Sequence, residues 1–170
     1  ASWPEFVLVT GNRNKVLEAE MVIHGRRGTR TVESRSWIEG NRRKVDEMSG
    51  GRLAYVWLPN TGFGGYTYFN RYYFAQQDKQ GAIIDERFNH GGLIADYLVD
   101  LMSRELLGYF NNPVGDKQPW TAPNAAIWGP KVMLINWRSA SDSEVTPMGF
   151  RDLGLGRIVG TPTYGAVIAT

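Results

Sequence analysis

Short hydrophobic runs alternate with stretches of helical periodicity along most of the chain. Apolar runs of strand length occur at residues 53–58, 81–85, 131–136 and 157–160. Apolar positions with helical spacing lie around and between them, at residues 36–49, 66–77, 93–107 and 144–152. Alternation of strands and helices is typical of α/β folds, in which crossover helices connect parallel strands. The pattern therefore predicts a twisted, mostly parallel sheet with helices packed on it.

Two of the predicted helices have further signals. Ser36 has the character of an N-cap, with Glu39 three residues later as its capping-box partner, and Gly50-Gly51 stops that helix. The 93–107 segment carries one apolar stripe along a helix face, formed by Leu93, Tyr97, Leu98, Leu101 and Met102. We expect that stripe to face the core.

The first 34 residues have a β pattern instead. An apolar run at 6–9 precedes a mixed run at 16–23, a turn at 24–28 and a return strand at 29–32. The mixed run and the return strand are predicted to form a hairpin. So few strands cannot close a core by themselves.

Residues 109–130 interrupt the alternation. This segment has no period and contains Pro113, Pro119, Pro123 and Pro130. Loops this long inside compact domains are usually functional walls or lids. A plain surface insertion is the alternative.

Composition excludes several functions. The formal charge is +2, and no basic stripe concentrates the positive side chains, so nucleic acid is not expected as a partner. No apolar run is long enough for a transmembrane helix, so no membrane partner is expected. The chain has no cysteine, which excludes disulfides, thiolate zinc sites and a cysteine nucleophile. Two histidines are too few for a histidine-rich metal site.

The start of the chain has no signal-peptide pattern, and we interpret it as the middle of a longer polypeptide.

Three short segments follow predicted strands, where α/β proteins place ligand-binding loops. Residues 85–92 form a glycine-rich turn before a helix, whose backbone N–H groups can hold an anion or a developing oxyanion. Residues 139–143 place Ser141 at a strand-to-helix turn, as in a nucleophile elbow. Residues 160–165 form a third loop. Taken singly, a glycine turn before a helix is more often only structural, and Ser141 is more simply interpreted as a helix cap.

Taken in order, four motifs resemble the tail-specific and tricorn protease superfamily. They are Gly51-x-x-x-Tyr55-x-x-x-Pro59, Asp85-x-Arg87-x-Asn89-x-Gly91-Gly92, Ser139-Ala-Ser141-Asp142 and Gly160-Thr-x-Thr-x-Gly165. Residues 35–43 and 153–157 are similar to the tricorn branch. The resemblance implies a crotonase-like protease core at 35–170, incomplete at its C-terminus. It also implies that residues 1–34 are the C-terminal part of a PDZ-like domain.

The resemblance assigns roles to individual residues. Ser141 would be the nucleophile, and the backbone N–H groups of Gly92 and Asp142 would form the oxyanion hole. Asp85 and Arg87 are interpreted as a structural pair that braces the turn.

The resemblance also bears on the catalytic base, the group that would accept the proton of Ser141. Ser–Lys members place a lysine where this chain has Ala166, so lysine is not the base. In tricorn proteins the histidine and the glutamate come from segments absent here, so the isolated chain should be inactive. His90 is an alternative base, although contact with substrate, together with Gly91, is the favoured role. His24 is interpreted as a surface residue.

Substrate preference depends on a departure from the family pattern. Tricorn proteins that prefer basic residues carry an aspartate where this chain has Phe110. An aromatic pocket without a carboxylate predicts cleavage after hydrophobic residues.

The resemblance further implies a cytoplasmic homo-oligomer that cleaves oligopeptides or unfolded chains, needs no cofactor or metal and feeds downstream aminopeptidases. A non-catalytic peptide-binding module with a degenerate protease fold is the main alternative. An α/β domain whose loops match by coincidence is the third.

Overall fold

The computed structural model describes residues 6–12, 15–21, 32–115 and 119–167. The strands are β1 (Phe6–Asn12), β2 (Lys15–Met21), β3 (Leu53–Trp57), β4 (Gly81–Asp85), β5 (Gly108–Phe110), β6 (Trp120–Ala122), β7 (Lys131–Ile135) and β8 (Gly156–Gly160). The helices are α1 (Val32–Ser49), α2 (Phe63–Phe74), α3 (Ala95–Ser103) and α4 (Asp142–Asp152). All four strands and all four helices predicted for residues 36–160 are present, with shifted ends.

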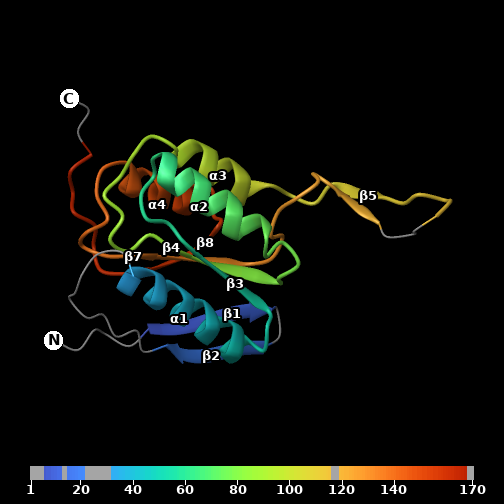
Figure 1. The fold of residues 1–170 in the computed structure, drawn as a ribbon, viewed down its shortest axis with the longest axis horizontal. Coiled ribbons are helices and arrows are strands. Elements are labelled where there is room, and N and C mark those ends of the chain that lie inside the picture. The colour runs from blue at the N-terminus through green and yellow to red at the C-terminus, as the bar shows by residue number, and fades with distance from the viewer. Residues whose placement is uncertain (1–5, 13–14, 22–31, 116–118, 168–170) are drawn as a thin grey trace.

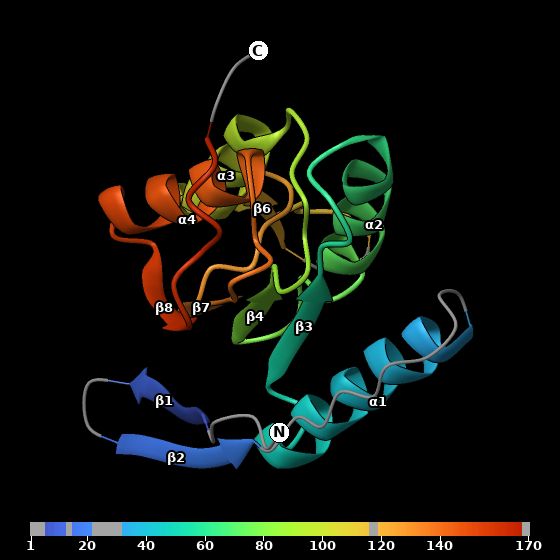
Figure 2. The same ribbon diagram turned by 90° about the vertical axis from the view of Figure 1, so that its left-hand side faces the viewer.

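The centre of the fold is a four-stranded parallel sheet in the order β3-β4-β7-β8. Figures 1 and 2 show α2, α3 and α4 on one face of this sheet and α1 on the other. This arrangement confirms the predicted α/β class with parallel pairing. It also explains the continuous apolar runs, because strands covered on both faces need hydrophobic side chains at every position.

Side-chain alternation along the strands separates two hydrophobic cores. The larger core packs beneath α2, α3 and α4, with Ala54, Val56, Ala82, Ile84 and Met133 from the sheet. The smaller core packs under α1, with Tyr55, Ile83 and Leu134 from the sheet and Ile38 and Val45 from the helix. Successive side chains on a strand point to opposite faces, so adjacent residues serve different layers.

Helix α1 begins earlier than predicted. It starts at Val32, so Ser36 lies inside the helix and the expected strand at 29–32 does not extend to residue 32. An N-cap bond is worth only about 1 kcal/mol, and residue types such as those of Glu33 and Arg35 extend a helix at little cost. The helix therefore gains a turn, and the expected domain boundary between residues 34 and 35 falls within it. Its end is as predicted, because Gly50 and Gly51 both adopt positive φ.

The described N-terminal residues form a strand pairing that was not predicted. β1 and β2 are antiparallel, with Phe6 opposite Met21 and Asn12 opposite Lys15. The described part of the mixed run thus pairs with the preceding strand, to which it has a short connection. Residues 29–31 of the expected return strand lie outside the described residues. The turn expected at 24–28, with His24, lies outside the described residues.

Helix α3 is shorter than the predicted 93–107 stripe. Leu98, Leu101 and Met102 are buried as expected, but Leu93 lies before the helix and is 94% exposed. The N–H of Leu93 donates to Thr61 O at 2.7 Å, and this bond holds the segment outside the helix. Periodicity alone could not show this contact with a distant loop.

Residues 108–122 contain a hairpin where the sequence indicated no period. β5 and β6 pair antiparallel, and Figure 1 shows this arm extending away from the helical layers. Tyr109, Phe110 and Trp120 are exposed on it. Strands of three residues are too short to leave a recognisable alternation.

None of the helices in the described part of the chain combines the length and the apolar character that crossing a membrane requires.

Candidate functional site

Three loops meet at the carboxyl ends of the central strands. The loop after β4 reaches Gly91, and the loop after β7 reaches Ser141. A Cβ atom added to Gly91 would lie 2.7 Å from Ser141 Cβ and 3.1 Å from Asp142 N. Only glycine fits this approach, and its φ of +99° also favours glycine. The structure therefore brings the two predicted loops into contact.

Ser141 occupies a strained turn immediately before α4. Its φ of 58° and ψ of −130° are rare for a residue with a side chain. Two hydrogen bonds hold this conformation: Ser141 N donates to Glu144 Oε2 at 2.9 Å, and Ala140 N donates to Asn89 O at 3.1 Å. Ser141 is partly exposed. A partly exposed hydroxyl on a sharp strand-to-helix turn has the geometry that nucleophile elbows use.

Two backbone amides beside Ser141 have no acceptor within the described residues: those of Gly92 and Asp142. On the Gly92 side, Thr61 N donates to Gly91 O at 3.0 Å and Leu93 N donates to Thr61 O at 2.7 Å. Because carbonyl and amide groups alternate in direction along an extended chain, the Gly92 N–H points away from Thr61. Both free N–H groups are therefore available to an oxygen atom of a ligand.

Glu144 joins the serine turn to the loop after β8. Its carboxylate accepts hydrogen bonds from the N–H groups of Ser141, Gly165 and Ala166 at 2.6–2.9 Å. Burial acts to raise the pKa of Glu144, but hydrogen bonds from Thr163 and from these amides lower it below its ordinary value. Sequence reasoning gave Glu144 no such role. The Ser-x-x-Glu spacing from Ser141 is a capping-box signal that points to it.

The Asp85–Arg87 pair that was predicted to brace the turn after β4 is present and buried. Arg87 Nε lies 2.8 Å from Asp85 Oδ1, and Arg87 Nη2 lies 2.5 Å from Asp85 Oδ2. Tyr55 donates to Asp85 Oδ2 at 2.6 Å, and the Arg87 guanidinium lies over the Trp37 ring. Burial, followed by the charge of Asp85, raises the pKa of Tyr55 well above its ordinary value. The pair thus connects α1, β3 and β4 beneath the loop.

A second buried carboxyl group, that of Glu86, lies between Asp85 and Arg87 in the sequence. Glu86 is fully buried, and burial raises its pKa well above the ordinary value, against a smaller opposing effect from Thr146. Its backbone carbonyl accepts from Ser139 Oγ at 3.0 Å and from Asn89 N at 3.2 Å. Burial therefore favours the neutral form of the Glu86 side chain, and its backbone carbonyl links the two loops.

The predicted site residues divide into two groups. Gly91, Gly92, Ser141 and Asp142 lie together, as described above. His90 is exposed in the same loop, and no described residue hydrogen-bonds to its ring. Phe110 ends β5 on the arm, which extends away from the sheet (Figure 1), so the fold does not place it beside Ser141 of the same chain.

Metal-binding side chains do not cluster in the described ranges: no group of three or more histidine, aspartate or glutamate residues there is arranged to hold an ion. The chemistry that the described loops offer around Ser141 is that of one hydroxyl and two amide donors.

Comparison with known proteins agrees with this geometry. The sequence profile of peptidase family S41 matches residues 52–170. The chain is 34% identical over 139 residues to the tricorn protease of Thermoplasma acidophilum, a match that covers 82% of this chain and 13% of that protein. It is 32% identical over 133 residues to tricorn protease homolog 1 of Streptomyces coelicolor, covering 78% of this chain and 12% of that one.

Comparison with solved structures points to the same family. A crystal structure of the tricorn protease matches with a TM-score of 0.77 and 30% identity, covering 92% of this chain and 15% of that chain. The chain thus spans a small part of the length of these relatives. The predicted resemblance and fold class are confirmed, and this chain belongs to peptidase family S41.

Proposed function

We propose that this chain is the core of a serine endopeptidase of the tricorn type, with Ser141 as its nucleophile. The observation that carries the proposal is the position of Ser141 on a strained turn, beside two N–H groups without an acceptor among the described residues. In this mechanism Ser141 Oγ attacks a peptide carbonyl carbon, and the carbonyl oxygen becomes an oxyanion. The N–H groups of Gly92 and Asp142 bind it, each contributing on the order of 3 kcal/mol to the transition state.

The mechanism needs a base that takes the proton of Ser141 and gives it to the leaving amine. A serine hydroxyl without a base is a poor nucleophile near neutral pH. Ala166 occupies the position of the lysine in Ser–Lys members, and its N–H is bonded to Glu144. We therefore place the base and its supporting glutamate outside this chain and expect the isolated chain to be inactive.

The substrates in this proposal are oligopeptides or unfolded polypeptides. Water hydrolyses the acyl-enzyme after the leaving amine departs, so the proposed reaction requires no cofactor or metal. We place the enzyme in a cytoplasmic homo-oligomer whose products pass to aminopeptidases. We also propose that residues 1–34, whose last three residues belong to α1, are the C-terminal part of a PDZ-like domain.

Covalent labelling tests the nucleophile. A fluorophosphonate probe should label the full-length protein at Ser141, and Ser141→Ala should abolish the label, because the probe reacts with activated serine hydroxyls. Ser103→Ala is the matched control, since Ser103 lies at the end of α3 and should leave the labelling unchanged. Peptide binding without any labelling would instead support the alternative, a peptide-binding module with a degenerate protease fold.

Fluorogenic peptides test the substrate preference. We expect the full-length enzyme to cleave after Phe or Leu at least about tenfold faster than after Lys or Arg, because an apolar site leaves an ammonium group unpaired. Since the arm of one chain extends away from the sheet (Figure 1), we propose that Phe110 contributes to the substrate site of a neighbouring subunit.

The Phe110→Asp variant tests whether Phe110 determines the preference for hydrophobic residues. It should raise the rate for Lys and Arg peptides relative to the parent, and Tyr109→Asp on the same arm serves as the control. Faster cleavage after Arg by the parent enzyme would contradict the preference.

A further inference from the structure

The side chain of Asp142 connects the two loops that carry the free amides. Its Oδ2 atom accepts hydrogen bonds from Ile94 N at 2.9 Å and from Ala95 N at 3.1 Å. Ile94 is the N-cap of α3 and Ala95 is its first residue. Asp142 itself is the first residue of α4. One residue thus offers a backbone N–H beside Ser141 and caps the helix that starts from the opposite loop.

This contact holds the segment that contains the other amide. Thr61 bonds to Gly91 and Leu93 on either side of Gly92 and shares the N–H of Ile94, at 3.0 Å, with the Asp142 carboxylate. The carboxylate alone accepts from Ala95 N. The N–H groups at a helix N-terminus carry partial positive charge, so an anionic acceptor is the favoured partner there. The segment that carries the Gly92 N–H is therefore held from two sides, by Thr61 and by the Asp142 carboxylate at the start of α3.

We propose that the Asp142 carboxylate is a positioning group that fixes the amides of Gly92 and Asp142 at a common distance from one oxygen atom. The inference rests on the proposed function, because those amides matter only if an oxyanion forms there. The carboxylate does not touch the substrate. It acts through the segment from Gly92 to Ala95 and through the start of α4.

A positioning residue and a purely structural capping residue differ in the effects that their replacement should have. A capping residue that only stabilises α3 should lower thermal stability and leave turnover unchanged. A residue that aligns two oxyanion donors should lower kcat and leave KM nearly unchanged, because the oxyanion exists only in the transition state. Small displacements of such groups reduce rates strongly.

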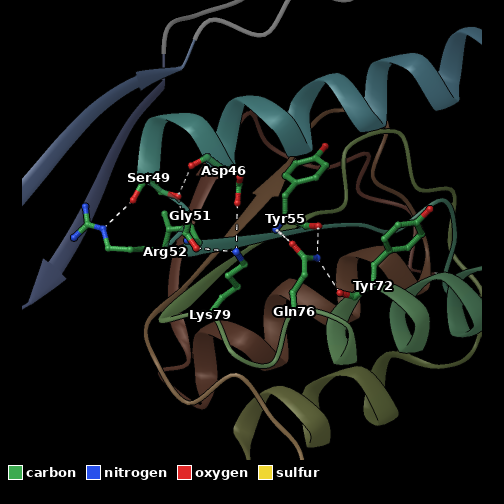
Figure 3. A network of polar contacts seen from close by, with 9 residues as sticks. Asp46, Ser49, Gly51, Arg52, Tyr55, Tyr72, Gln76 and Lys79 are labelled. Atoms are coloured by element: carbon green, nitrogen blue, oxygen red, sulfur yellow. Dashed lines mark hydrogen bonds and ion pairs between the residues drawn. The ribbon is translucent and has the colours of Figure 1, made fainter.

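The test uses the full-length enzyme and three variants. Asp142→Ala removes the acceptor, and Asp142→Asn keeps an acceptor oxygen without the charge. Gln76→Ala is the matched control: it removes a side-chain clamp between α2 and β3, in which Gln76 bonds to the backbone of Tyr55 and Tyr72 (Figure 3). For each variant kcat, KM, the thermal midpoint and the inhibition constant of a peptide boronic acid are measured.

Asp142→Ala should lower kcat about 10- to 100-fold, change KM less than about threefold and weaken boronic acid inhibition in parallel with kcat. Asp142→Asn should lower kcat about three- to tenfold. Gln76→Ala should lower the thermal midpoint without lowering kcat. If Asp142→Ala does not fold, the graded loss in Asp142→Asn decides the question.

Turnover of both Asp142 variants within about twofold of the parent would overturn the proposal. A rise in KM at constant kcat would overturn it as well, because that result indicates a binding role. If the parent enzyme neither cleaves peptides nor reacts at Ser141, the proposed function itself fails. An active parent with normal Asp142 variants removes this inference alone.

Discussion

Replacement of Asp85 by alanine should lower the free energy of unfolding of this chain by about 3–5 kcal/mol. Asp85 is fully buried and accepts hydrogen bonds from the Arg87 guanidinium and from Tyr55. Removing the carboxylate leaves a buried guanidinium without its counter-charge and a buried hydroxyl without its acceptor. Both are expensive, because a low-dielectric interior does not replace the lost hydration. Denaturant unfolding of the parent and the variant measures the difference.

Asp46→Ala is the matched control for this prediction. Asp46 pairs with Lys79 at 3.3 Å on an exposed surface, where such pairs contribute about 0–1 kcal/mol. The two variants lose the same side chain and one ion pair each, and they differ in burial. A loss below about 1 kcal/mol for Asp85→Ala would contradict the bracing role of the Asp85–Arg87 pair.

Replacement of Glu86 by glutamine should stabilise the chain relative to the parent increasingly as pH rises. The pKa of Glu86 is raised in the folded state by burial, from an ordinary value of 4.5. Between 4.5 and the higher folded pKa, the carboxyl group therefore keeps its proton in the folded state and loses it in the unfolded state. Unfolding releases a proton in that range, so the parent loses stability as pH rises, by up to about 1.4 kcal/mol per pH unit for this group.

The contribution of a protonated Glu86 to the free energy of unfolding is thus fully present below pH 4.5. It is lost as pH rises through the folded pKa. Glutamine has similar shape and cannot ionise, so Glu86→Gln escapes this loss. Denaturant unfolding at several pH values from about 4 to 8 gives the difference between variant and parent. Glu47→Gln, on the exposed face of α1, controls for the loss of one carboxyl group. A difference that does not change with pH would show that Glu86 is ionised in the folded chain.

The central fold was readable from the sequence because its signals are local. The strands at 53–57, 81–85 and 131–135 are nearly continuous apolar runs, as two covered faces require. Gly50 and Gly51 end α1 through positive φ angles that few other residues adopt. The ion pair of Asp85 and Arg87 was also readable, since two residues separated by one position at a strand end share one turn.

Three expectations were wrong because competing interactions decided them. Ser36 was expected to cap α1, but residues before it continue the helix. Leu93 was expected to face the core, but its amide is bonded to Thr61 and its side chain is exposed. Residues 109–130 were expected to form a loop, but β5 (Gly108–Phe110) begins just before them and pairs with β6 (Trp120–Ala122). Hydrophobic periodicity reports neither the interactions of a backbone group nor strands as short as these.

The sequence by itself determined the types of group at the site: a serine before one helix, glycines before another and an alanine where a lysine would supply a base. Only the tertiary structure decided that these groups meet. The contact between Gly91 and Ser141, and the bond from Asp142 to the start of α3, join loops about fifty residues apart in sequence. Parallel pairing of β4 with β7 brings their carboxyl ends to one edge of the sheet. Local patterns carry the preferences of single segments, whereas the distances between segments follow from how those segments pack.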